Sequence, residues 1–159
     1  MILIIGYGNS LRRDDGAGLI LAEKLEDELR RRELDVERIA VHQLTADLAL
    51  SVAADAVTAV VFVDTRVAAA GDGQIQMDLQ VQSLGAEQGS QTLGHHVGPA
   101  AILTYARLLY DRSPPAWLLT APGFEFDHGE GLSEAAERAL DTLPAVLERL
   151  PPGWPLPTN

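Results

Sequence analysis

The chain has 159 residues, of which 47% are hydrophobic, and a formal net charge of −11 at pH 7. This length predicts one domain, and no apolar run reaches the roughly 20 residues of a membrane span. The acidic balance opposes nucleic-acid binding, because phosphate contacts need clustered lysine and arginine. The absence of cysteine excludes disulfides and thiolate nucleophiles, and it leaves His, Asp and Glu as metal ligands. No basic and apolar leader is visible at the N-terminus and no broad apolar stripe stands out, so we expect a cytoplasmic monomer.

The first third of the chain alternates apolar strands with amphipathic helices. The apolar residues 2–5 predict a buried strand, and apolar residues at helical spacing predict a helix over about 15–32. Strands are predicted over 36–43 and 57–63, with a short helix capped by Thr45 and ending at Ala53 between them. This order indicates an α/β protein, and if the first three strands take the sheet order 2-1-3, Asp15 and Asp64 border the crevice at the switch point of the sheet.

The second half of the chain is more varied. Residues 74–79 alternate polar and apolar side chains, which predicts a strand with one exposed face, at an edge and antiparallel. The remaining expected segments are a polar loop over 82–94, a helix over 98–110, a strand over 116–121, a helix over 133–150 kinked at Pro144, and an irregular proline-rich tail over 151–159. The sequence thus predicts a single-domain, three-layer α/β sandwich over residues 1–150, with a mostly parallel, twisted sheet of about five strands and helices on both faces.

A glycine-rich loop that ends in two carboxylates follows the first strand. Gly6 and Gly8 begin like a dinucleotide-binding fingerprint, but Leu11 stands where that fingerprint needs its third glycine. Asp14 and Asp15 would repel a phosphate, and the Gly-Lys-Ser/Thr of a P-loop is absent. The loop therefore offers hard oxygen ligands rather than a phosphate cradle.

The segment from Gly6 to Gly18 resembles the N-terminal signature of the nickel-iron hydrogenase maturation endopeptidases. That signature is a strand, Gly-x-Gly-Asn-x-Leu, a short spacer, Asp-Asp/Glu-Gly-x-Gly and an amphipathic helix, and every element is present. The resemblance extends over about residues 1–150 and includes the segment 98–107. The sequence departs from the family at Gln43-Leu44-Thr45, where members often carry Gly-Gly-Thr. Thr45 is kept, but the two glycines are lost, so the shape of the substrate groove and the hydrogenase group served are not fixed by the resemblance.

The resemblance implies that Asp15, Asp64 and His95 are both the metal-binding and the catalytic residues. Asp64 directly follows a predicted buried strand, and His95 precedes a predicted helix. His95 is preferred to its neighbour His96 because the family pattern is His-x-x-Gly, which here ends at Gly98. One imidazole and two carboxylates suit a borderline divalent ion such as nickel and leave positions open for other ligands.

Each of these residues also has a plainer interpretation. Asp15 alone is explained by negative charge in the first turn of a helix, Asp64 by a turn, and His95 or His96 by a helix start or a surface position. Other polar residues either support the site or are ordinary surface and loop residues: Asp14, Asp47, Asp127, Glu125, His128 and the spare histidine His42. Ser10 and Ser133 are interpreted as a loop residue and an N-cap rather than as nucleophiles.

The resemblance implies an endopeptidase that removes the C-terminal extension of the nickel-loaded large-subunit precursor of a nickel-iron hydrogenase. The nickel would then be supplied by the substrate rather than held by the free enzyme. The competing hypotheses are a non-catalytic nickel-binding or metallochaperone α/β module, and a different small α/β hydrolase on the same scaffold. The protease hypothesis predicts that the precursor loses its C-terminal extension, whereas the nickel-binding module predicts a precursor of unchanged length.

Overall fold

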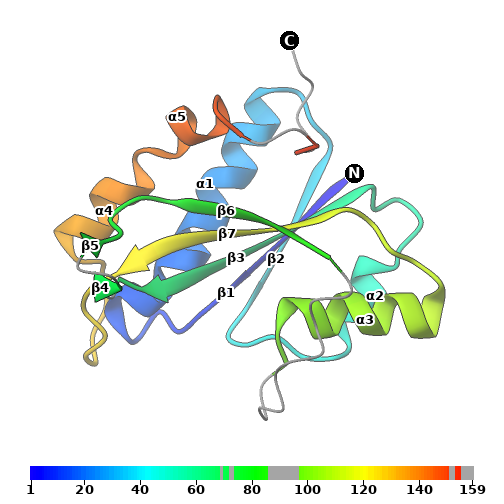
Figure 1. The fold of residues 1–159 in the computed structure, drawn as a ribbon, viewed down its shortest axis with the longest axis horizontal. Coiled ribbons are helices and arrows are strands. Elements are labelled where there is room, and N and C mark those ends of the chain that lie inside the picture. The colour runs from blue at the N-terminus through cyan, green and yellow to red at the C-terminus, as the bar shows by residue number, and fades with distance from the viewer. Residues whose placement is uncertain (69, 72–73, 86–96, 151–152, 155–159) are drawn as a thin grey trace.

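The computed structural model describes residues 1–68, 70–71, 74–85, 97–150 and 153–154. Its centre is a five-stranded sheet with the order β2-β1-β3-β7-β6 (Figure 1). The first four strands in this order are parallel, and β6 is antiparallel to β7 at the edge. The strands are β1 (Ile2–Tyr7), β2 (Val36–Val41), β3 (Ala59–Val67), β6 (Gln80–Leu84) and β7 (Ala116–Gly123). The mostly parallel sheet is confirmed, and the 2-1-3 order on which the shared crevice depended is the observed one.

Helices cover both faces of this sheet, as Figure 1 shows. The helix α1 (Ala17–Arg31) packs on one face with α4 (Glu134–Leu140) and α5 (Leu143–Leu147). The helices α2 (Leu48–Val52) and α3 (Pro99–Tyr110) pack on the other. The three-layer α/β sandwich expected from the sequence is therefore the observed fold. In the described part of the chain, no helix is both long and apolar enough to cross a membrane.

Side chains from β1 alternate between the two halves of the hydrophobic core. Ile2 and Ile4 belong to the cluster under α1, whereas Leu3 and Ile5 belong to the cluster under α2 and α3. A strand buried on both faces needs an unbroken apolar run, which is why residues 2–5 carry no polar side chain. The same period of two places Tyr7 on the face of Leu3 and Ile5.

The helix expected over 15–32 begins later, because a 3-10 turn precedes it. This turn, η1 (Arg13–Gly16), contains Asp15, and α1 starts at Ala17. The helix expected from Thr45 is also shorter, since α2 begins after Asp47 and Thr45 makes no capping bond with its side chain. Instead, the carbonyl of Thr45 accepts a hydrogen bond from the Leu48 amide in a turn. Both starting positions predicted from the sequence were therefore wrong.

The sheet has the antiparallel edge strand that was expected, but at a different position in the chain. Strand β5 (Gln74–Ile75) pairs antiparallel with β4 (Ala70–Gly71), and the antiparallel edge strand is β6, which begins at Gln80 and extends into the start of the stretch expected to be a loop. The physical reason lies in Arg66, whose guanidinium donates to the carbonyls of Gln76 and Asp78. Because a side chain occupies these carbonyls, the segment does not pair as a strand. Residues 86–96 of the expected loop lie outside the described residues.

The single helix expected over 133–150 is divided into α4 and α5. Pro144 lies in the first turn of α5, where its missing amide hydrogen costs nothing, whereas inside a continuous helix it would leave the Leu140 carbonyl without its partner. The expected kink is thus a complete break. Beyond α5, Trp154 is buried in the core against the ring of Trp117, with ring centroids 5.5 Å apart. A residue of the expected tail therefore takes part in the core.

Candidate active site

The glycine loop after β1 brings Asp15 back to the end of its own strand. Gly8 has φ +148°, and a Cβ at this position would collide with the Asp15 carbonyl oxygen. Only glycine accepts both constraints without strain. The Asp15 carboxylate then accepts a hydrogen bond of 3.1 Å from the backbone amide of Asn9. The loop is closed on itself, with a partly buried Asp15 at the carboxyl end of β1.

Asp14 points the opposite way and anchors this loop to the C-terminal part of the chain. Its carboxylate is fully buried and accepts hydrogen bonds from the amides of Phe124 (2.8 Å), Glu125 (3.0 Å) and Ser133 (2.7 Å), and from the Ser133 hydroxyl (2.6 Å). Burial by itself would raise the pKa of Asp14, but the four hydrogen bonds outweigh it and hold this pKa below its ordinary value. The two neighbouring aspartates therefore have different roles. Asp14 fixes the loop to the C-terminal part of the chain, whereas Asp15 lines the cavity.

Asp64 lies on β3 where the strand passes beyond its buried run. Its Oδ1 accepts the Thr65 amide at 2.7 Å, and its carboxylate also accepts the Tyr7 hydroxyl. Burial raises the pKa of Asp64, the negative charge of Asp15 raises it further, and the two hydrogen bonds only partly offset these effects.

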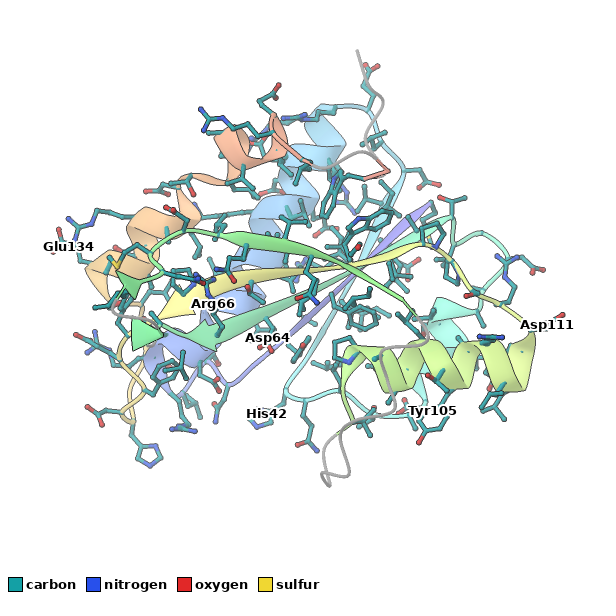
Figure 2. The ribbon with its side chains drawn as sticks, viewed as in Figure 1. His42, Asp64, Arg66, Tyr105, Asp111 and Glu134 are labelled. Carbon is teal, nitrogen blue, oxygen red and sulfur yellow. The ribbon has the colours of Figure 1, made fainter. Side chains whose placement is uncertain are left out.

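Asp15 and Asp64 line the same cavity of about 420 Å³ at the carboxyl ends of β1 and β3. This is the switch point of the sheet, where ligands of open α/β folds bind. Figure 2 shows Asp64 and His42 on the side of the sheet that carries α3. The cavity is also lined by residues from β1, the loop after β2 and the segment before α3: Tyr7, Gly8, His42, Gln43, Leu44, Thr45, Ala46 and Val97.

The third residue expected in the site, His95, lies outside the described residues, as does its rival His96. Val97, two residues after His95, lines the cavity. Among the residues that the structure describes, no three carboxylate or imidazole side chains are grouped closely enough to hold a metal ion. The described lining of the cavity includes two carboxylates, Asp15 and Asp64, which can supply hard oxygen ligands for a divalent ion or a base for an attacking water.

The other polar candidates take ordinary structural positions. Glu125 forms an ion pair with Arg13, which ties the loop after β7 to the turn η1. Ser133 is the N-cap of α4, where its hydroxyl accepts the Ala136 amide at 3.2 Å, as expected from the sequence. The remaining candidates of this group are exposed to solvent: Ser10, Asp47, Asp127 and His128.

Sequence reasoning missed Tyr7 and did not place His42. The register of β1 against β3 pairs Gly6 with Val63, so the next residues, Tyr7 and Asp64, are neighbours on one face. Period-two alternation over residues 3, 5 and 7 was a signal that could have identified Tyr7. His42 directly follows β2, and the 2-1-3 strand order was the signal that brings the end of β2 beside the end of β1.

Replacing Ser133 with alanine should lower the free energy of unfolding by about 1 to 2 kcal/mol, because α4 loses its cap and Asp14 loses one donor. Chemical denaturation of the variant checks this value. Ser10→Ala is the matched control, since Ser10 is exposed and should change stability by less than about 0.5 kcal/mol. Equal losses in the two variants would mean that the Ser133 hydroxyl has no special role.

The fold matches solved hydrogenase maturation proteases over most of the chain. The hydrogenase maturating endopeptidase HybD from E. coli is 18% identical, with a TM-score of 0.64, and the match covers 93% of this chain and 92% of that one. The [NiFe] hydrogenase maturation protease HybD from Thermococcus kodakarensis is 21% identical, with a TM-score of 0.61, and the match covers 93% of this chain and 97% of that one. The endopeptidase HycI from Escherichia coli is 16% identical, with a TM-score of 0.64, and the match covers 94% of this chain and 90% of that one. No protein-family model matches the sequence, and no curated protein matches it. The chain therefore has the fold of the hydrogenase maturation endopeptidases.

Proposed function

We propose that this chain is an endopeptidase that removes the C-terminal extension from the nickel-loaded large-subunit precursor of a nickel-iron hydrogenase. The observation that carries the proposal is the pair of carboxylates, Asp15 and Asp64, in one cavity at the switch point of the sheet. The solved structures that share this fold include hydrogenase maturation endopeptidases, which supports a protease role.

In this proposal the nickel belongs to the substrate, and the two aspartates recognise it together with His95. A precursor without nickel lacks the ion that these ligands bind, so it is not positioned for cleavage. When bound, a divalent ion polarises a carbonyl or lowers the pKa of a water molecule. Alternatively, a carboxylate of the site acts as the general base for an attacking water, and burial, which raises the pKa of Asp64, favours Asp64 for that role.

The experiment is incubation of the protein with the large-subunit precursor, in nickel-loaded and metal-free forms, followed by intact-mass spectrometry. The proposal predicts that only the nickel-loaded precursor is shortened, by the mass of one C-terminal peptide. An unshortened precursor that holds its nickel rejects the protease proposal. Transfer of nickel to this chain with no change in precursor mass would instead support the nickel-binding module, and cleavage of both forms would support a hydrolase that does not recognise nickel.

A further inference from the structure

Tyr7 is the last residue of β1 and lies beside the candidate catalytic aspartate. The parallel register of β1 and β3 makes Tyr7 the neighbour of Asp64, on the face of the sheet that carries α2 and α3. Tyr7 lines the cavity that contains Asp15 and Asp64 and is itself partly buried. Tyr7 therefore packs against the hydrophobic cluster under α2 and α3 and also forms part of the wall of the site.

The Tyr7 hydroxyl donates a hydrogen bond to the Asp64 carboxylate. The Thr65 amide donates a second bond, of 2.7 Å, to Oδ1 of the same carboxylate. One donor belongs to β3 itself and the other to the adjacent strand, so rotation of the carboxylate about its terminal torsion would break at least one of them. A phenol is protonated at neutral pH, so the Tyr7 hydroxyl has a proton to donate.

We propose that Tyr7 is a positioning residue, whose hydroxyl holds the Asp64 carboxylate in the orientation that faces the cavity shared with Asp15. The structural part of this inference concerns this chain alone, whereas its catalytic consequence depends on the proposed protease function. A carboxylate that binds an ion or accepts a proton must be held close to its productive geometry. The free Asp64 side chain loses that orientation when the hydroxyl is removed, although its charge and its strand are unchanged.

The test is Tyr7→Phe, which removes the hydroxyl and keeps the ring that packs against the hydrophobic cluster under α2 and α3. Tyr105→Phe is the matched control, because Tyr105 is exposed on α3, away from the sheet (Figure 2), and its loss makes the same chemical change. Two readouts are used: the orientation of the Asp64 carboxylate in crystal structures of the variants, and separate kcat and KM values for cleavage of the nickel-loaded precursor.

We expect Tyr7→Phe to turn the Asp64 carboxylate away from its wild-type orientation and to lower kcat roughly tenfold with KM nearly unchanged. Tyr105→Phe should match the wild type in both readouts. An Asp64 carboxylate in the wild-type orientation in Tyr7→Phe would overturn the inference, as would an unchanged kcat. If the wild type itself leaves the precursor intact, the proposed function fails, and the crystal structures alone decide the role of Tyr7.

Discussion

Replacing Asp64 with asparagine is expected to lower kcat/KM for cleavage of the nickel-loaded precursor by roughly 10²- to 10⁴-fold. The amide keeps the size of the side chain and its hydrogen bond from Thr65, but it loses the negative charge and the basic oxygen. Asp15→Asn should have a loss of the same order, because both carboxylates line one cavity. Steady-state assays by mass spectrometry measure these values.

The stability of the Asp64→Asn variant separates a catalytic defect from misfolding. A raised pKa means that the folded protein disfavours the charged carboxylate, so the stability from this group is full below its unfolded pKa of about 3.9 and is lost as pH rises through its folded pKa. A neutral asparagine removes that cost. At pH 7 the variant should therefore be at least as stable as the wild type while losing activity, and Asp127→Asn, at an exposed acid, should change neither. An active Asp64→Asn variant would exclude Asp64 from the chemistry.

Asp14→Ala should produce the opposite result, a large loss of stability. The substitution leaves three backbone amides and the Ser133 hydroxyl without the acceptor that they share, and the two bonds from Ser133 are buried whereas those from Phe124 and Glu125 are partly buried. Each unsatisfied buried group costs about 1 to 3 kcal/mol, and partial relaxation reduces the sum, so we expect a loss on the order of 3 to 5 kcal/mol. Denaturant unfolding at pH 7 measures this loss. Asp127→Ala is the control, because Asp127 is exposed and lies two residues after Glu125, whose amide donates to Asp14.

This loss should also depend on pH in a defined direction. Because the folded pKa of Asp14 is lowered, its ionised form contributes stability above the unfolded pKa of about 3.9, and that contribution disappears as pH falls through the folded pKa. The difference in free energy between the wild type and Asp14→Asn should therefore shrink in acid. A difference that stays constant from pH 7 to pH 3 would show that the charge of Asp14 is not what the four donors stabilise.

The parallel core was predictable from the sequence because its strands carry simple signals. The apolar runs that became β1 and β3 can be buried only between two layers of helices, and the amphipathic helix α1, which connects β1 to β2, favours a parallel crossover between those two strands. The 2-1-3 order was a condition rather than a derivation: given that order, Asp15 and Asp64 were expected to border one crevice, and both line the cavity at the switch point of the sheet.

The parts that were not predicted depend on contacts between segments distant in sequence. The turn η1 forms with Arg13 at φ +46° because Asp14 is held by Phe124, Glu125 and Ser133, more than 100 residues away. The segment before β6 is similarly fixed by Arg66 rather than by its own alternating pattern. Local periodicity contains no information about such partners.

At the site itself, the sequence identified the charged residues but not the residue that orients one of them. Tyr7 resembles any aromatic residue at the end of a buried strand until the register with β3 is known. The position of His95 stays a prediction, since it falls outside the described residues. His42 is the imidazole that lines the described cavity, although it was considered a spare histidine.

The most direct test of the central claim locates the nickel relative to the two aspartates. A complex of this chain with a nickel-loaded precursor whose scissile bond has been blocked would be crystallised, and anomalous scattering at the nickel edge would position the ion. Our account predicts nickel in the cavity, within about 2.0 to 2.2 Å of one carboxylate oxygen from each of Asp15 and Asp64. Nickel bound at a different surface of this chain, with neither carboxylate as a ligand, would contradict it.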